Sequence, residues 1–260
     1  MPRAGDQSGT HTSHGLPRHS GPLIHVARSK ANVRERLRAS DGEIGQVQDF
    51  YFDDKTWAVR YVVVDTGSWL AGRLVLLSPH AFDRLHQVRE LLSLNLTRKQ
   101  IEKSPSIESH KPVSRQYEEE YHRYYGWPLY WEGGSLWGVN AFPILETPAD
   151  CLPGKATRAS RQLPKITDTH LRSTLNVSGY RLEAIDGRMG HVSNFMMDIQ
   201  DWAITRLVIK TGWLPGREVE IPTKKIDRII YDESTVFVNL TGKMIEQSPS
   251  HRPSAVALAT

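Results

Sequence analysis

The sequence predicts a mainly β protein in which two small β-barrels follow one another along the chain, joined by a linker that contains one helix. Three observations lead to this prediction: a long internal repeat, short β-branched and aromatic runs between glycine turns, and a proline- and aromatic-rich segment between the two copies. With 260 residues, the chain can hold one large domain or two small ones.

The repeat is most visible in two strings, "TGSWLAGR" at 66–73 and "TGWLPGR" at 211–217. When Ala39–Ser106 is aligned with Ala184–Ser250, with one gap opposite Ser68, 28 of 67 paired positions are identical. Because chance does not produce such a match, we interpret the chain as a duplicated domain of about 80 residues. This interpretation requires that the two aligned segments share a topology and do not form a single intertwined core.

Each copy has the pattern of short strands that end in one helical turn. The dipeptides Asp41-Gly42 and Asp186-Gly187 are typical of hairpin turns, since glycine adopts the positive φ that such turns need. The runs "WAVRYVVVD" and "WAITRLVIK" alternate as half-buried strands do. Shorter strands are expected around 82–85, 91–96 and 236–240.

The strings "TRKQIEKSP" and "TGKMIEQSP" predict a short helix at the end of each copy, with Thr97 and Thr241 as N-caps. Five or six short strands with glycine-rich corners and one terminal helix predict a small closed or partly closed barrel. Closure removes the unpaired strand edges that otherwise promote aggregation.

The ordered set of motifs resembles the photosynthetic reaction-centre (PRC) barrel family. The set consists of D-G-x-x-G-x-V, an acidic turn, a strand that begins with tryptophan, and T-G-W-L-x-G-R. This family occurs in the cytoplasmic part of the reaction-centre H subunit and in a ribosome-maturation factor, and the resemblance covers about 160 of the 260 residues. It implies a compact β-barrel that serves as a docking module, with no shared catalytic residues.

The expected organisation has five parts, which composition and the repeat delimit. They are a disordered basic tail at 1–22, a first PRC barrel at 23–106, a linker at 107–166 with an aromatic helix at about 115–126, a second PRC barrel at 167–250, and a disordered tail at 251–260.

The repeated string supplies the first candidate binding residues, Trp69 and Arg73 with their counterparts Trp213 and Arg217. The favoured interpretation of the two indoles is that each closes one end of its barrel. Residues that occur in both copies of a duplicated fold are expected to support the fold before they serve a binding role.

The two arginines of the string have two competing interpretations. They are suited to clamping a carboxylate or phosphate, or to a protein–protein contact. The alternative is an ion pair with Asp65 or Glu43 within the first copy. Lys210 and Arg188 occupy those positions in the second copy, which slightly favours packing or binding.

The linker contains eight of the 22 aromatic residues of the chain, within 117–138. Four tyrosines fall at i, i+4, i+7 and i+8 from Tyr117, on one face of a helix. The favoured interpretation is that this helix packs on one barrel and fastens the two together. An exposed aromatic strip that receives a protein partner is the alternative, and nucleic-acid stacking is disfavoured by the nearby glutamates. The candidate residues are Tyr117, Tyr121, Tyr124, Trp127 and Trp131.

Several functional classes lack support in the sequence. No phosphate-loop, dinucleotide or hydrolase-elbow string is present, and no cysteine cluster suits zinc, so we expect no catalytic residues, no metal and no cofactor. The single Cys151 favours a cytoplasmic location, and no apolar run approaches the roughly 20 residues that cross a bilayer. Residues 1–40 carry a net charge of +5 against −1 for the rest, which we interpret as a solubilising tail.

The sequence therefore favours a non-enzymatic binding or assembly module that docks to protein partners, with the two barrels packed as an intrachain pseudo-dimer. One alternative is a ribosome- or RNA-associated protein that resembles the maturation factor. A second is a peripheral component of a photosynthetic or electron-transport membrane complex. An enzyme with a site in a barrel mouth is the least favoured.

Overall fold

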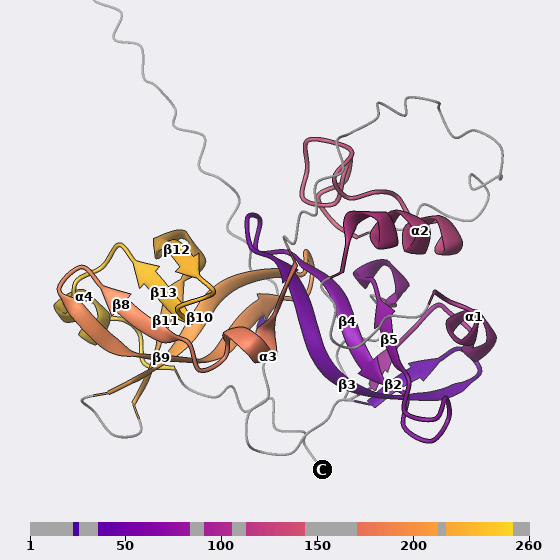
Figure 1. Ribbon diagram of the computed structural model, residues 1–260, viewed down its shortest axis with the longest axis horizontal. Helices are drawn as coiled ribbons and strands as arrows, with labels where there is room; N and C mark the ends of the chain where they lie inside the picture. Colours follow the sequence, from indigo (N-terminus) through magenta and orange to yellow (C-terminus); the bar gives the residue numbers. More distant parts are fainter. Residues whose placement is uncertain are drawn as a thin grey trace, which may run out of the picture.

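The computed structural model shows a mainly β protein with two sheets lying side by side (Figure 1). Trp213 lies outside the residues that the structure describes, as do the expected tail at 1–22, residues 252–260, and the linker segments 106–112 and 144–170. No helix of the described residues is both long and apolar enough to cross a membrane. The described residues are 23–25, 36–83, 91–105, 113–143, 171–212 and 217–251.

The first sheet has the strand order β5-β4-β3-β2-β6, and β7 pairs with the end of β3. All neighbours are antiparallel except β2 and β6, which run parallel. Its strands are β2 (Arg36–Ala39), β3 (Gly42–Asp53), β4 (Val59–Asp65), β5 (Leu74–Leu77), β6 (Leu91–Ser93) and β7 (Leu171–Ser173). The helices that accompany it are η1 (Pro79–Ala81), α1 (Arg98–Glu102) and α2 (Arg115–Tyr125).

The second sheet has the order β11-β10-β9-β8-β13-β12, and β1 pairs with the end of β9. Its strands are β1 (Leu23–His25), β8 (Arg181–Ala184), β9 (Gly187–Asp198), β10 (Ala203–Thr211), β11 (Glu218–Pro222), β12 (Ile226–Ile230) and β13 (Thr235–Val238). The helices that accompany it are η3 (Thr223–Lys225) and α4 (Gly242–Glu246). Helix α3 (Thr174–Val177) instead packs on the first sheet, where the hydroxyl of Thr174 donates to the carboxylate of Asp49 in β3.

Five strands of each sheet follow the same order, and β12 of the second sheet has no counterpart among the described strands of the first. Strands β8 and β9 begin 145 residues after β2 and β3, and α4 begins 144 residues after α1. As in the first sheet, β8 pairs with β13 in parallel. The aligned segments 39–106 and 184–250 therefore lie in separate sheets of matching order, with α1 and α4 at opposite ends of the molecule (Figure 1).

The expectation of closed barrels is not met, because both sheets are open within the described residues. Other parts of the chain cover one edge strand of each sheet, β5 in the first and β11 in the second. The hydroxyl of Tyr121 on α2 donates to the carbonyl oxygen of Leu76 in β5. Along β11, the N–H of Glu220 donates to the carbonyl of Pro249, and the N–H of His251 donates to that of Glu218. Edges that are covered in this way do not need closure to be protected.

Each half lends one short strand to the sheet of the other half. Leu23 of β1 lies opposite Asp198 at the end of β9, and Leu171 of β7 lies opposite Asp53 at the end of β3. Strand β1 falls in the range expected for the first barrel, and β7 falls in the range expected for the second. Both exchanged strands lie outside the aligned repeat segments.

A reciprocal contact joins the halves between these exchanged strands. Ala58 and Ala203 form an isolated antiparallel bridge. The N–H of Val59 donates to the carbonyl of Trp202, and the N–H of Ile204 donates to that of Trp57, both at 2.8 Å. The two tryptophans have φ values of 62° and 56°, in the left-handed region that bulky residues rarely adopt. The same backbone geometry thus occurs on both sides of the joint.

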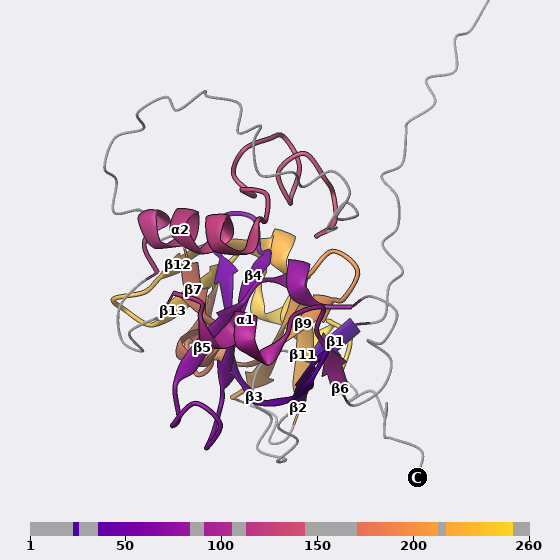
Figure 2. The same ribbon diagram turned by 90° about the vertical axis from the view of Figure 1, so that its right-hand side faces the viewer.

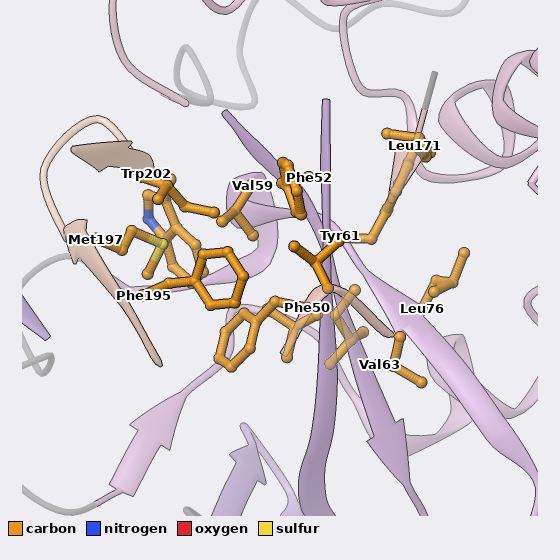
Figure 3. Close-up of a cluster of buried hydrophobic side chains, with 14 of the residues drawn as sticks. Phe50, Phe52, Val59, Tyr61, Val63, Leu76, Leu171, Phe195, Met197 and Trp202 are labelled. Atoms are coloured by element: carbon orange, nitrogen blue, oxygen red, sulfur yellow. The ribbon is translucent and has the colours of Figure 1, made fainter. Parts of the chain in front are cut away.

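The hydrophobic core continues across this joint, as Figure 3 shows. The ring centres of Phe52 and Phe195 lie 5.9 Å apart, and those of Phe82 and Trp202 lie 4.8 Å apart. Both phenylalanines of the first pair are fully buried, and burial of such a side chain contributes about 1.5–3 kcal/mol. The repeat segments occupy separate sheets of matching order, as the duplicated-domain interpretation requires, but they share one continuous hydrophobic core rather than having two separate ones.

Candidate functional site

The repeated arginines Arg73 and Arg217 bind the ends of the short helices. Arg73 donates to the carbonyl oxygens of Glu102 at 2.8 Å and Ser104 at 2.6 Å. Its counterpart Arg217 donates to the carbonyl of Glu246 at 2.7 Å. Terminal helix carbonyls lack partners within the helix and attract cations, so both guanidinium groups stabilise helix ends.

Other repeated residues hold the opposite ends of the same helices. The carboxylate of Asp41 accepts the N–H of Arg98 at 2.8 Å, and that of Asp186 accepts the N–H of Gly242 at 2.7 Å. The predicted N-cap Thr97 forms a capping box with Gln100, and Thr241 also caps its helix, so both N-cap predictions are confirmed. The repeated polar residues thus fasten a helix to each sheet.

Helix α2 packs on the first half through a row of tyrosines, and both ribbon views show it above β4 and β5 (Figure 1 and Figure 2). Tyr117 donates its hydroxyl proton to the carbonyl of Pro105 at 3.0 Å, and Tyr124 donates to that of Gln100 at 2.8 Å. Tyr121, which lies between them, is fully buried and donates to Leu76. Tyr124 remains 41% exposed. Most of this candidate aromatic face therefore forms an internal contact.

The two candidate tryptophans of the linker continue the same cluster. Trp127 is buried and stacks on Tyr125 with 4.2 Å between ring centres. Trp131 lies under the guanidinium of Arg115 at 4.1 Å and has its ring centre 5.8 Å from that of His122. The structure therefore brings all five linker candidates together in one region, next to α2.

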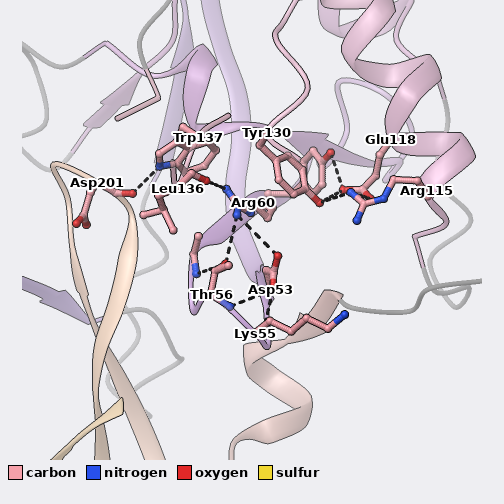
Figure 4. Close-up of polar contacts among 12 residues, drawn as sticks. Asp53, Lys55, Thr56, Arg60, Arg115, Glu118, Tyr130, Leu136, Trp137 and Asp201 are labelled. Atoms are coloured by element: carbon pink, nitrogen blue, oxygen red, sulfur yellow. Dashed lines mark hydrogen bonds and ion pairs between the residues drawn. The ribbon is translucent and has the colours of Figure 1, made fainter. Parts of the chain in front are cut away.

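A buried polar group that the sequence analysis did not identify lies at the centre of this region (Figure 4). We call it the Glu118 cluster; it consists of Arg60, Tyr61, Arg115, Glu118, His122 and Tyr130. The carboxylate of Glu118, which is fully buried, accepts hydrogen bonds from Tyr130 at 2.5 Å and Tyr61 at 3.1 Å. Arg115 lies 3.3 Å from its other oxygen. Burial raises the pKa of both tyrosines, which keeps the hydroxyls protonated as donors.

His122 is a neutral member of the cluster. Its Nδ1 lies 2.8 Å from the carbonyl oxygen of Pro128, so Nδ1 carries the proton and Nε2 is left as an acceptor. The hydroxyl of Tyr61 lies 2.9 Å from that Nε2 and 3.1 Å from the Glu118 carboxylate, so its single proton is shared between these two acceptors. Burial lowers the pKa of His122 to about 4, and the cations Arg60 and Arg115 act in the same direction.

Arg60 connects the cluster with the segment that follows α2. Its guanidinium donates to the carbonyl of Leu136 at 2.6 Å and lies 3.9 Å from the ring centre of Tyr130. Asp53 supplies an opposite charge at 3.7 Å. Trp137, at 4.8 Å from the same guanidinium, donates its indole N–H to the carbonyl of Asp201 in the second half. The linker is therefore bonded to both halves.

The Glu118 cluster has the residue types of an acid–base site, yet its polar groups bind one another. General acid–base catalysis requires a group within hydrogen-bond reach of a substrate. Glu118, His122 and Arg60 are all at most 3% exposed. Within the described residues, no group of three or more His, Cys, Asp or Glu side chains is arranged to hold a metal ion. The arrangement is suited to fixing the linker rather than to chemistry.

The remaining candidate, Trp69, lies in an open groove of about 640 Å³ at the outer end of the first half. The guanidinium of Arg98 lies 4.5 Å from its ring centre. The lining residues are Asp41, Trp69, Arg98, Lys99, Glu102 and Lys103.

No protein-family model matches the chain, and no curated protein matches its sequence.

Proposed function

We propose that the chain is a non-enzymatic assembly module of two PRC-barrel-like domains, which acts in the cytoplasm by docking to protein partners. The duplicated domain is supported by the shared strand order of the two sheets and by the equivalent contacts of Arg73 and Arg217. The open sheets depart from the closed barrel that the family implies. The two domains act as an intrachain pseudo-dimer, which the reciprocal Ala58–Ala203 bridge supports.

One observation carries the proposal: the repeated aspartates and arginines contact the ends of the corresponding helix in both halves. Asp41 and Asp186 accept helix N–H groups, and Arg73 and Arg217 donate to helix carbonyls. These side chains therefore serve the fold in both halves. A reactive site would be expected to show a polar cluster open to a substrate, whereas the Glu118 cluster is closed.

Site-specific photocrosslinking in cells of the source organism tests the proposal. A benzoyl-phenylalanine is placed at the exposed Lys99 of the first half, at its counterpart Lys243 of the second, or at Tyr124 on α2. We expect a discrete protein adduct from at least one position. Adducts with RNA or ribosomal proteins would instead favour the ribosome-associated alternative, and adducts with integral membrane subunits would favour the membrane-complex alternative. The absence of any adduct from all three positions would contradict a docking role.

A further inference from the structure

The groove beside Trp69 is the surface feature that the fold itself does not explain. It lies between the loop 66–73 and the outer face of α1. Trp69 and Arg98 are half-buried, and Lys99 and Lys103 are exposed one helical turn apart on α1. An indole ring and several cations thus face the same open space, and tryptophan and arginine are the residue types that dominate binding hot spots.

Backbone and capping hydrogen bonds hold both sides of the groove. Within the loop, the N–H of Trp69 donates to the carbonyl of Thr66 at 3.2 Å, and the N–H of Gly72 donates to that of Gly67 at 2.6 Å. On the other side, the capping box of Thr97 fixes the first turn of α1. A ligand would therefore bind a preformed surface, which lowers the entropy lost on binding.

The charge of the groove differs between the halves. In the first half, the groove is lined by the cations Arg98, Lys99 and Lys103 and by the acids Asp41 and Glu102. The net charge of this lining is +1. The carboxylate of Asp41 is already bound to the N–H of Arg98.

In the second half, Gly242, Lys243 and Gln247 occupy the positions of the three cations, and Asp186 and Glu246 occupy those of the two acids. The net charge of these five positions is −1. Both halves form the same helix with the same supports. The second half has Gly242 and Gln247 at the positions of Arg98 and Lys103, and it still forms the helix. These two cations are therefore not needed to build α1.

We infer that the groove beside Trp69 binds a protein partner through a short acidic segment that contains an aromatic residue. The aromatic ring would pack on Trp69 next to Arg98, and isolated carboxylates would pair with Lys99 and Lys103. Asp41 and Glu102 on the rim disfavour a nucleic acid, which carries a negative charge at every nucleotide. This inference rests on the proposed docking function and names the partner chemistry.

Fluorescence anisotropy on the full chain tests the inference. The probe is a labelled eight-residue peptide with two Phe, two Asp and one Glu among glycines, and its neutral twin has Asn and Gln in place of the acids. We expect the acidic probe to bind and Lys99→Gln/Lys103→Gln to weaken binding about tenfold. Both lysines are exposed, so this double variant does not disturb the fold. Arg98→Gly/Lys103→Gln, which copies the second half, should have a similar effect.

Lys243→Gln is the matched control, because it removes one exposed helix lysine from the second half, and it should leave binding unchanged. The ¹⁵N–H indole resonance of Trp69, assigned with Trp69→Phe, should shift on titration with the acidic probe. Absence of binding at about 0.05 M salt would overturn the inference. It would also be overturned if both probes bound equally well, or if the Lys99/Lys103 variant bound the acidic probe as tightly as the natural chain does. Tighter binding of an oligouridylate through the same lysines would also overturn it.

The two proposals fail in distinguishable ways. If the photocrosslinking experiment gives protein adducts only from Lys243 or Tyr124, the docking function stands and the groove inference is rejected. If the acidic probe fails to bind while Lys99 still crosslinks to a protein, the groove docks a partner of other chemistry, and the inference is again rejected.

Discussion

The indole N–H of Trp137 donates to the backbone carbonyl oxygen of Asp201 at 2.8 Å, which bonds the linker to the second half. The ring of Trp137 also lies 4.8 Å from the guanidinium of Arg60 in β4. One arginine therefore organises a contact in which the first half, the linker and the second half all take part. The stability of this joint should depend on that single buried charge.

Replacement of Arg60 by methionine should lower the free energy of unfolding by about 3 kcal/mol, because it leaves the buried Asp53 without its counter-charge and the Leu136 carbonyl without its donor. Urea denaturation at pH 7 measures the change. Arg36→Met is the control, since Arg36 and Glu43 are both about two-thirds exposed and their pairing contributes about 0.5 kcal/mol or less. Equal effects of the two substitutions would show that Arg60 does not organise the joint.

The stability of the protein should fall as the pH drops from about 6.5 to about 4, because of His122. In this window the unfolded chain binds a proton at His122, and the folded chain, with its pKa lowered to about 4, does not. The unfolded state thus holds more protons, and at pH 4.5 the loss from this group amounts to about 2 to 3 kcal/mol relative to pH 7.

The variant His122→Asn isolates this contribution, since an asparagine amide can still donate to the Pro128 carbonyl and does not titrate. Denaturant unfolding at a series of pH values should show a shallower acid loss in the variant than in the natural chain. Burial raises the pKa of Asp49, which acts in the opposite direction and is present in both proteins. Parallel pH profiles would mean that folding does not lower the pKa of His122.

Local patterns in the sequence were sufficient for both N-caps and for several strands of each half. The strand expected around 82–85 is wrong as far as it is described, since Phe82 forms only an isolated bridge with Leu94 and Asp83 lies in no strand. Thr97 accepts the N–H of Gln100, only three positions along the chain. The apolar run of β4 is also visible within the strand itself, but the predicted half-buried alternation is wrong, because Val59–Val64 are all buried between packed neighbours.

The exchanged strands could not be predicted in the same way. Strands β1 and β7 have three residues each, too few for a periodic pattern, and their partners lie more than 100 positions away. The prediction of closed barrels was wrong. The edge strands β5 and β11 are covered by α2 and by residues 249–251, and such covering depends on tertiary packing.

The contacts of the candidate site residues were harder to predict. The groups that these residues contact lie far away in the sequence, or are backbone atoms that no sequence pattern marks. Arg73 binds backbone carbonyls, which every residue has, so no side chain in the sequence marks its target. Arg60 had one usable signal, a charge inside the apolar run of β4, which indicates a buried cation with a dedicated partner. That partner, the carbonyl of Leu136, lies 76 positions away. The Trp69 groove likewise depends on Arg98 in another element.

Tyr121→Phe and Tyr124→Phe should separate internal packing from surface exposure on α2. The first removes the donor to the Leu76 carbonyl at a fully buried site and should cost about 1–3 kcal/mol of stability. The second removes a donor from a side chain that is 41% exposed and should cost less than about 1 kcal/mol. Thermal or urea unfolding compares the two. A larger effect for Tyr124 would mean that α2 does not pack on β5 through Tyr121.

Gly45→Ala and Gly190→Ala should each destabilise the protein by about 3 kcal/mol or more, because neither site has room for a side chain. An added Cβ would lie 2.0 Å from the carbonyl oxygen of Asp65 at Gly45, and 2.2 Å from that of Lys210 at Gly190. Both glycines also have φ values, 140° and 153°, that L-residues rarely adopt. The contact is with backbone, so no side-chain movement can relieve it.

The matched control is Gly212→Ala, where an added Cβ meets no atom within 4 Å, and its effect should stay within about 1 kcal/mol. Urea denaturation of the three variants measures the comparison, with soluble yield as a second readout if a variant does not fold. We expect similar losses of stability at Gly45 and Gly190. Each is the second glycine of a D-G-x-x-G string, and each permits the same close approach of two strands in its sheet. Near-natural stability of either variant would show that the two sheets are not built alike at this point, and the duplicated-domain proposal would lose its strongest local support.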